Sequence, residues 1–441
     1  MPSDASSLDA IVARLLALHP KRIDLSLDRI QRLLAALDHP ERRLPPVIHV
    51  AGTNGKGSTV AFMRAVLESA GKRVHVYTSP NLVRLNERFR VGQAGGGQLV
   101  GVAELADVLA ECEGKNGVAP ITVFEIETAA AFLLFSRHPA DVVLLEVGLG
   151  GRLDATNVVE RPLVSVITRV SVDHPEFLGD SIEQIAAEKA GILKRHVAAV
   201  VSSQSREALA VIERQAARMR APLHIAGEHW TATEERGRLV YQDNDGLLDL
   251  PPPRLYGRHQ FENAGTAIAA LRASGLTLPG SAFEKGMTSV EWPARMQRLS
   301  QGELVVLLPP ESELWLDGGH NVDGGRAVAA ALADLEERVS RPLVLIVGML
   351  STKDSEGFLK NFTGLARRVI TVPIRQANAV PPAALAEVAS NVGIPAISRD
   401  DIASALTIAG KLDLEPAPRI LITGSLYLAG EVLAANGTLP E

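Results

Sequence analysis

The chain has 441 residues, 46% of them hydrophobic, and a chain of this length is expected to form two or three domains of about 150 residues each. Its formal net charge of −6, without a long run of like charges, argues against binding to nucleic acid or to an anionic membrane. Cys112 is the only cysteine, which excludes an internal disulfide and a metal site built from cysteines.

Apolar runs alternate with segments of helical periodicity up to about residue 219. Most of these runs are continuous, which is typical of strands buried on both faces of a parallel sheet. We expect strands at Val47–Ala51, Arg73–Thr78, Asp141–Val147, Leu163–Thr168 and Ala198–Ser202. We expect helices at Val60–Ala70, Val102–Glu111, Glu125–Phe135, Ser181–Leu193 and Arg206–Met219. This order predicts a mostly parallel sheet flanked by helices.

The pattern changes between residues 226 and 250, where turn formers such as Asn244-Asp245-Gly246 suggest a small antiparallel excursion. A helix is expected from His259 to Ser274, and a second alternation of strands and helices starts near Glu303. Its expected strands are Val305–Leu308, Leu314–Asp317, Leu343–Gly348, Val369–Val372 and Ile420–Thr423. Its expected helices are Gly325–Val339, Ala383–Ser390, Asp401–Lys411 and Tyr427–Ala435.

The fold class that follows is α/β with two domains. Residues 1–295 are expected to form a P-loop-type domain with a mostly parallel sheet flanked by helices. Residues 296–441 are expected to form a smaller, Rossmann-like α/β domain, and the boundary is placed between Pro293 and Gly302.

A glycine-rich loop, Gly52-Thr53-Asn54-Gly55-Lys56-Gly57-Ser58, lies between an expected strand and an expected helix. Glycines let backbone N–H groups turn toward an anion, and the helix start offers further N–H groups and its positive dipole end. Lys56 would add a charge for the β- and γ-phosphates, and a nearby hydroxyl could reach Mg²⁺. The loop therefore predicts a nucleoside triphosphate site, with ATP as the expected nucleotide. A glycine-rich structural turn is the alternative, because Gly57 separates Lys56 from Ser58, unlike the general motif.

Polar residues follow several of the other expected strands. Ligands of open α/β sheets lie at the carboxyl ends of the strands, so Glu146 would face the glycine loop and could bind Mg²⁺. A surface glutamate is the alternative, although Gly148, Gly150 and Gly151 favour a loop that approaches a ligand. His174 follows a neighbouring strand and is either a structural histidine or a ligand of metal or phosphate.

Later segments allow similar pairs of interpretations. Lys189 lies on an expected helix, where a solvated surface charge is the plainest interpretation. Arg295 could reach the phosphates when the domains close, or it could belong to a linker in which Trp292 is packed. Asp317-Gly318-Gly319-His320-Asn321 and Thr423-Gly424-Ser425 each follow a strand and are either site residues or structural turns.

Taken together, these segments resemble the folylpolyglutamate synthase/dihydrofolate synthase family of the Mur ligase superfamily. The resemblance covers nearly the whole chain, and the inserted Gly57 favours the folate branch over the cell-wall ligases. It rests on GTNGKGS at 52–58, TSPNLVRLNER at 78–88, EVGLGGRLDATN at 146–157, DHPEFLG at 173–179, EKAGI at 188–192, WPARMQ at 292–297 and DGGHN at 317–321. The chain departs at Val172, Ala294 and Gly319, where the family usually has leucine, glycine and alanine.

The resemblance implies an ATP-dependent amide ligase. ATP phosphorylates a substrate carboxylate, the amino group of L-glutamate attacks the acyl phosphate, and a tetrahedral intermediate collapses to amide, ADP and phosphate. The acceptor would be dihydropteroate, a folate γ-carboxylate, or both. The segment Ile23-Asp24-Leu25-Ser26-Leu27-Asp28-Arg29 resembles one present in bifunctional bacterial members, which favours dihydropteroate use. Another Mur-type carboxylate–amine ligase and an ATP-dependent switch that forms no amide are the alternatives.

The resemblance also implies roles for single residues. Lys56 would hold the phosphates, together with the rest of the loop from Gly52 to Ser58. Ser79 and Glu146 resemble ligands of a first Mg²⁺, with Ser58 as another candidate. His174 resembles a ligand of a second Mg²⁺, and Lys189 matches a lysine that is often carbamylated, which would make it an anionic oxygen ligand.

The remaining implied roles concern the two substrates. Asn263 resembles an adenine contact, and Arg295 and Asp317 resemble contacts to the ATP phosphates and ribose. His320 and Ser425 are candidates near the incoming glutamate or the transferred phosphate. The other candidates for binding the substrate, on its pterin side or near it, are Arg88, Phe124 and Asp154.

No apolar stretch approaches the ~18 residues that a membrane span needs, and the first residues lack the basic start and apolar core of a secretory signal. We therefore expect a cytoplasmic protein that acts on small molecules without nucleic-acid or membrane partners. We also expect a monomer.

Overall fold

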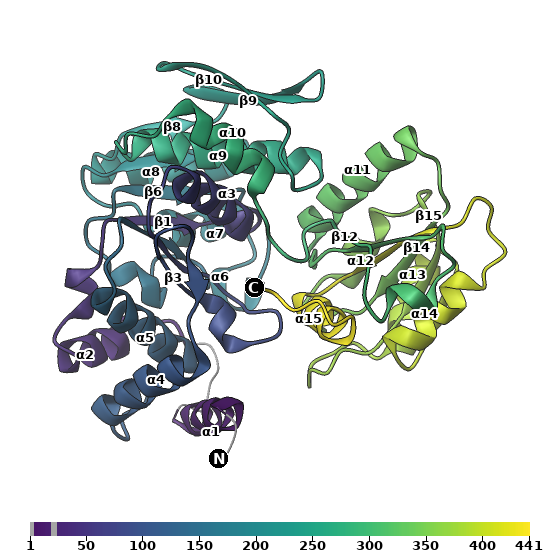
Figure 1. Cartoon of the computed structure of the whole chain (residues 1–441), viewed down its shortest axis with the longest axis horizontal. Coiled ribbons are helices and arrows are strands. Elements are labelled where there is room, and N and C mark those ends of the chain that lie inside the picture. The colour runs from purple at the N-terminus through teal and green to yellow at the C-terminus, as the bar shows by residue number, and fades with distance from the viewer. Residues whose placement is uncertain (1–3, 19–23) are drawn as a thin grey trace.

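The computed structural model describes residues 4–18 and 24–441, so Ile23 of the segment 23–29 lies outside the described residues. Two α/β units lie side by side, and the chain passes from one to the other near residue 296 (Figure 1). The first unit is the larger and carries an eight-stranded sheet, and the second carries a six-stranded sheet. The fold class is therefore the α/β arrangement that the sequence predicts.

The eight-stranded sheet has the order β4-β3-β2-β5-β1-β6-β7-β8. All neighbouring pairs from β2 to β8 are parallel, whereas β3 pairs antiparallel with both β2 and the edge strand β4. The strands are β1 (Val47–Ala51), β2 (Val74–Tyr77), β3 (Phe89–Val91), β4 (Gln98–Leu99), β5 (Val142–Glu146), β6 (Val164–Ile167), β7 (Ala198–Val201) and β8 (Leu223–Ile225). The central strands β1 and β5 are buried along their whole length, as their continuous apolar sequences predict.

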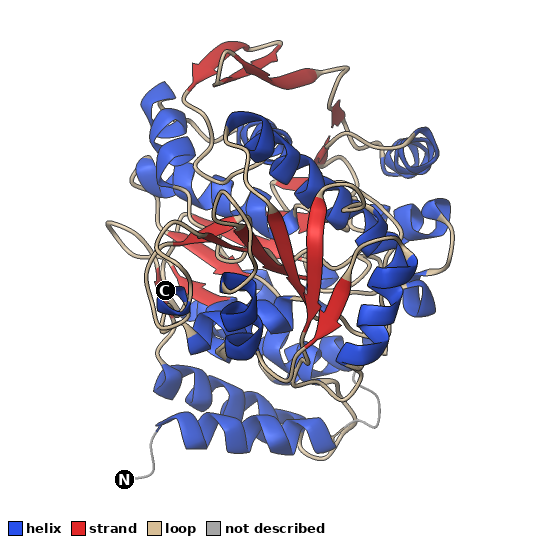
Figure 2. Cartoon of the chain, turned by 90° about the vertical axis from the view of Figure 1, so that its right-hand side faces the viewer, coloured by secondary structure: helices blue, strands red, loops and turns tan. Residues whose placement is uncertain are grey.

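Helices cover both faces of this sheet. Figure 2, in which the second unit faces the viewer, shows the strands surrounded by helices. One face packs against α3 (Lys56–Ser69), α9 (Arg258–Ala273) and α10 (Gly280–Ser289). The other packs against α2 (Asp28–Ala36), α4 (Val102–Asn116), α5 (Val123–Arg137), α7 (Ile182–Ala190) and α8 (Arg206–Met219), and α1 (Asp4–Ala17) lies on α4 and α5. Each fully buried Val, Leu or Ile contributes about 1.5–3 kcal/mol, so these two layers hold the sheet rigidly under the site.

A short helix and a small sheet complete the first unit. Helix α6 (Pro175–Leu178) follows β6, and the serine at position 181 caps α7 by accepting a hydrogen bond from the backbone N–H of Gln184. The small sheet is β9 (Trp230–Glu235), β10 (Arg238–Asp243) and β11 (Gly246–Leu250), which confirms the predicted antiparallel excursion. It packs on α9 through Trp230 and Tyr241.

The six-stranded sheet has the order β12-β13-β17-β14-β15-β16, and only its edge strand β12 is antiparallel. Its strands are β12 (Gln297–Leu299), β13 (Glu313–Leu316), β14 (Leu343–Val347), β15 (Ala366–Thr371), β16 (Ala396–Ser398) and β17 (Arg419–Thr423). Its helices are α11 (Val322–Arg338), α12 (Ser355–Lys360), α13 (Pro382–Asn391), α14 (Ile402–Gly410) and α15 (Leu426–Ala435).

One expected strand is wrong. Val305–Leu308 was expected to be a strand, but Val305–Leu307 forms a short 3₁₀ helix with no buried residue, and Val306 is 79% exposed. A short apolar run cannot be assigned from periodicity alone, because the pairing partner decides. The unpredicted elements are short or lie at the ends of the chain and the edges of the sheets: α1, α2, α6, α10, α12, β3, β4, β8, β12 and β16.

The two units touch where α15 meets the loop after β2. A Cβ atom on Gly430 would overlap with the carbonyl oxygen of Leu82. We expect the added methyl group of Gly430→Ala to push α15 away from this loop. Overpacking of this kind should lower the free energy of unfolding by about 1–3 kcal/mol. Thermal unfolding should show the loss in this variant.

The matched control is Gly114→Ala, a helical glycine with open space around its Cβ direction. There alanine should stabilise the protein by about 1 kcal/mol because it favours the helix. Equal behaviour of the two variants would contradict the close packing of α15 on the first unit.

Candidate active site

The glycine loop connects the buried strand β1 to helix α3. Gly55 has φ of 89° at the helix N-cap, a conformation that favours glycine, and a Cβ there would overlap with the side-chain oxygen of Asn263. Lys56 Nζ folds back across the loop and lies 3.2 Å from the carbonyl oxygen of Gly52 and 3.9 Å from Glu146 Oε1. The helix start and a lysine ammonium group therefore face the same small space, as an anion site requires.

Glu146 ends β5, the strand next to β1, and its register partner is Val50. Its side chain is buried, and burial raises the pKa of Glu146 to about 7, although Lys56 and Arg295 and the backbone N–H of Ser79 lower it. A buried carboxylate of this kind is stabilised in its charged form when a further cation comes close.

Lys189 is not the solvated surface charge that its place on a helix alone suggests. Its side chain is buried, and its Nζ donates a hydrogen bond of 2.9 Å to the carbonyl oxygen of Gly52. Burial, together with the neighbouring charge of Lys56, lowers the pKa of Lys189 to about 7. Helix α7 thus delivers a second ammonium group to the underside of the glycine loop.

A cavity of about 210 Å³ collects most of the predicted nucleotide and metal residues. It lies between the two units, since loops of both line it. Its predicted lining residues are Gly52, Thr53, Asn54, Gly55, Lys56, Gly57, Ser58, Ser79, Glu146, His174, Lys189, Asn263, Arg295, Asp317 and His320. Segments that are distant in the sequence thus meet at one point.

Two of these residues have structural partners as well. Both oxygens of Asp317 accept backbone N–H groups, from Met296 at 2.8 Å and from Gly319 at 2.7 Å. Arg295 Nη1 donates to the carbonyl oxygen of Ala294 at 2.9 Å. The Asp317 carboxylate therefore fixes the crossover between the units, and it does so at the wall of the cavity.

A second cavity of about 330 Å³ collects the predicted substrate residues Arg88, Phe124, Asp154 and Ser425. It shares Ser79, His174 and His320 with the first cavity, so the two adjoin.

Several polar groups of the second cavity already have partners within the protein. Arg88 pairs with Glu127 at 2.6 Å, and Asp154 accepts the backbone N–H groups of Leu149 and Thr156. Ser425 caps α15 by accepting the backbone N–H of Tyr427. Phe124 adds an aromatic ring to the largely apolar lining of this cavity, and a ring of this kind can stack on a flat ligand.

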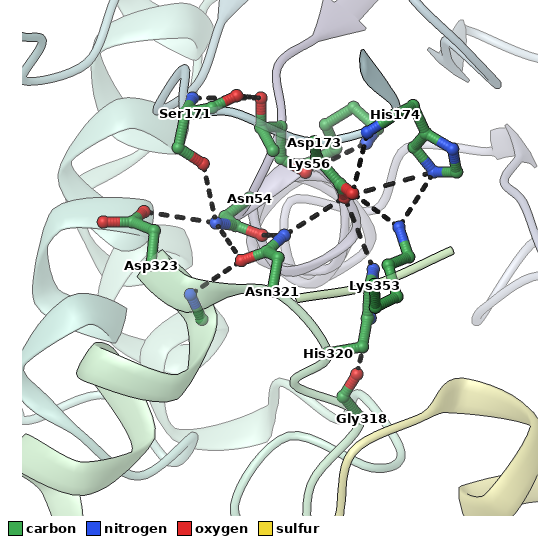
Figure 3. A network of polar contacts seen from close by, with 12 residues as sticks. Asn54, Lys56, Ser171, Asp173, His174, Gly318, His320, Asn321, Asp323 and Lys353 are labelled. Carbon is green, nitrogen blue, oxygen red and sulfur yellow. Dashed lines mark hydrogen bonds and ion pairs between the residues drawn. The ribbon is translucent and has the colours of Figure 1, made fainter. Parts of the chain in front are cut away.

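A polar network joins the two units beside the cavities (Figure 3). Its centre is Asp173, which pairs with Lys353 at 2.5 Å and accepts a hydrogen bond of 3.2 Å from Asn321. Burial alone would raise the pKa of Asp173, but His320, Lys353 and His174 hold it well below its usual range. Burial and the charge of Lys353 lower the pKa of His174 to about 4, so this imidazole is neutral near neutral pH.

Sequence patterns alone do not predict that Asp173, Asn321 and Lys353 belong to one site. Lys353 could have been found, because it follows β14, and ligands gather at the carboxyl ends of such strands. Its position opposite Asp173 depends on how the two units pack, which no local pattern shows.

The donors fit a magnesium ion that is completed by a nucleotide. Among the described residues, no group of three or more His, Cys, Asp or Glu side chains could hold a metal by itself. Mg²⁺ is usually bound by one or two carboxylates with phosphate and water oxygens, and Glu146 with the hydroxyls of Ser58 and Ser79 offers such hard donors.

Two family models match this chain. Residues 50–271 match the Mur ligase middle domain, and residues 306–435 match the dihydrofolate synthetase C-terminal domain. The dihydrofolate synthase/folylpolyglutamate synthase of Escherichia coli is 34% identical over 98% of this chain and 96% of its own length. The chain belongs to this family. The dihydrofolate synthase/folylpolyglutamate synthase of Bacillus subtilis is 33% identical over 92% of this chain and 94% of its own length.

Solved structures of the family agree in fold. The E. coli enzyme in complex with DHPP and ADP gives a TM-score of 0.87 at 33% identity, covering 98% of both chains. The Yersinia pestis enzyme complexed with AMPPNP and Mn ion gives 0.85 at 32% identity, covering 99% of both. Within residues 4–18 and 24–441, no helix combines the length and apolar character needed to cross a membrane.

The buried Glu146 predicts a pH-dependent stability of the metal-free protein. A pKa raised from 4.5 to about 7 corresponds to about 3 kcal/mol, at roughly 1.4 kcal/mol per pH unit. The folded state then binds more protons than the unfolded state between these values, so this contribution to stability is present at low pH and lost as the pH rises.

We therefore expect Glu146→Gln to be more stable than the wild type above pH 7 in metal-free buffer, with the difference shrinking toward pH 4.5. Denaturant unfolding at several pH values measures this. A difference that does not change with pH would show that Glu146 keeps an ordinary pKa.

Proposed function

We propose that this chain is an ATP-dependent ligase that adds L-glutamate to dihydropteroate, to the γ-carboxylate of folates, or to both, through an acyl phosphate. The proposal rests on one observation. The cavity of about 210 Å³ at the glycine loop, called the phosphate cavity below, and the second cavity of about 330 Å³ share Ser79, His174 and His320. A carboxylate held by a flat ligand in the second cavity would therefore meet the end of a triphosphate in the first.

The names of the relatives support the same substrates. The E. coli relative has been solved with DHPP and ADP, and another relative with Mn, AMPPNP and L-glutamate. With the acceptor held by the second cavity and ATP by the glycine loop, the remaining requirement is a place for the amine. Ser425 and His320 line the second cavity from the second unit and are proposed to stand near the incoming glutamate.

The chain's charges suit the first chemical step. A carboxylate and a triphosphate repel each other, and a carboxylate is a poor electrophile until it is phosphorylated. Lys56 and Arg295 line the phosphate cavity and supply positive charge there before any bond forms. Bound Mg²⁺ would neutralise further phosphate charge, held by Ser58, Ser79 and Glu146. Holding the two substrates in the reacting geometry can lower the activation barrier by about 7–11 kcal/mol.

The remaining proposals concern the finer features of the site. A second Mg²⁺ would use His174 and a carbamylated Lys189, whose amine lies buried beside the loop. We also propose two domains at 1–295 and 296–441, a monomer and a cytoplasmic location.

A cell-wall ligase and a nucleotide-driven switch are the competing functions. An assay of ADP release separates them from the proposal. We expect release only when ATP, Mg²⁺, L-glutamate and either dihydropteroate or a tetrahydrofolate are all present. Release with nucleotide alone, independent of the amine, would establish a switch, and release with cell-wall precursors in place of pteroates would establish the other ligase.

The matched variants for this assay are Lys56→Ala and Lys285→Ala. Lys56 contacts the glycine loop, whereas Lys285 is an exposed residue on α10. Removing one preorganised charge from such a site costs roughly 3–4 kcal/mol, so Lys56→Ala should lose about 100- to 1,000-fold in kcat with a normal melting profile. Lys285→Ala should keep full activity.

The carbamate at Lys189 has a test of its own. Intact-mass spectrometry under non-denaturing conditions with bicarbonate should show the added mass of one CO₂, and Lys189→Arg should not show it. An unmodified wild-type mass at saturating bicarbonate would refute carbamylation.

A further inference from the structure

The Asp173 carboxylate is the point at which groups of the second unit contact the loop that carries His174. Its Oδ1 atom lies 2.5 Å from Lys353 Nζ, and its Oδ2 atom lies 3.2 Å from Asn321 Nδ2 and 3.6 Å from His320 Nε2 (Figure 3). Asp173 belongs to the connection between β6 and α6, whereas its partners follow β13 and β14. These contacts exist only while the two units are together.

The same contact reaches the residues that line both cavities. Asp173 Oδ1 accepts the backbone N–H of His174 at 3.0 Å, and Lys353 Nζ lies 3.2 Å from His174 Nε2. His174 has φ of 54°, a left-handed conformation that a non-glycine residue holds only when its surroundings impose it. The imidazole is thus held from its backbone by Asp173 and at its ring by Lys353.

Asn321 extends the contact to the phosphate loop. Its amide nitrogen also donates to Asn54 Oδ1 at 3.0 Å, while Asn54 Nδ2 donates to Asn321 Oδ1 at 3.2 Å. One side chain of the second unit therefore touches both the loop that faces the phosphates and the carboxylate that holds His174.

We propose that Asp173 is a positioning residue that couples closure of the second unit to the active site, with Lys353 as its principal partner. When the units separate, Lys353 and Asn321 leave together, so His174 loses the contact at its ring and Asn54 loses its contact to Asn321. Asp173 and Lys353 are only 10% and 7% exposed in their side chains, so the ion pair is desolvated when it forms. Because desolvation offsets most of the attraction between the two charges, such a pair contributes more to fixing one geometry than to stability.

The test is a double-mutant cycle with Asp173→Asn and Lys353→Met. Each variant should lower kcat about 100-fold, as a small misplacement of reacting groups does, while the KM for ATP changes little. Because both residues act through one contact, the double variant should be no slower than the slower single variant.

The control is an interdomain ion pair away from the cavities. Arg258 on α9 lies 2.7 Å from Asp334 on α11, and its side chain is 70% exposed. Arg258→Met should therefore leave both kcat and KM near the wild-type values, because an exposed pair contributes little.

Small-angle X-ray scattering with Mg²⁺ and AMPPNP supplies a readout that does not depend on ligation. The radius of gyration should be larger for Lys353→Met than for the wild type and for Arg258→Met. Equal radii, effects of the two substitutions that multiply, or a rise in the KM for glutamate alone would each overturn the proposal. Absence of ligation in the wild type would sink only the proposed function.

Discussion

The site is built around one backbone carbonyl oxygen, that of Gly52, on which two lysine side chains converge. Lys56 and Lys189 both donate to the carbonyl of Gly52, at 3.2 and 2.9 Å, and Glu146 Oε1 lies 3.9 Å from Lys56 Nζ. Burial and the neighbouring charge of Lys56 lower the pKa of Lys189 to about 7, so positive charge at both amines is costly without an anionic partner. The phosphates of a nucleotide would supply that partner, so the protein is arranged around a ligand charge that its own residues do not provide.

The sheet topology explains why these charges converge. Strands β5, β1 and β6 are parallel neighbours, so their carboxyl ends bring Glu146, the glycine loop and the segment before Asp173 to one edge. The second unit brings the loops after β13 and β14 to the same edge. Two parallel sheets facing each other at their ligand-binding ends therefore form a site that neither could complete alone.

Local sequence was sufficient for the central parallel strands, the glycine loop and the capped helix α7, because each depends on its own residues. It could not give the burial of Lys189, which follows from the packing of α7 under the loop, nor the pairing of Lys353 with Asp173, which joins two units. Periodicity likewise assigned a strand at Val305–Leu308, where no neighbouring strand accepts it. The sequence does not show how the elements are placed relative to one another. Most contacts around Asp173 depend on that placement, because they join residues of two units.

Gly57, the unusual glycine after Lys56, is also explained by how elements distant in the sequence are placed. A Cβ at Gly57 would lie 2.8 Å from the indole ring of Trp292, on the segment that leads into the second unit. The first turn of α3 therefore carries both the backbone N–H groups that are proposed to bind phosphate and the glycine against which Trp292 packs. Gly148 similarly leaves room for the ring of Phe124 at the second cavity. In this protein such glycines mark places where two segments must approach closely, so the departure from the general phosphate-loop sequence is explained by the packing of Trp292 against α3.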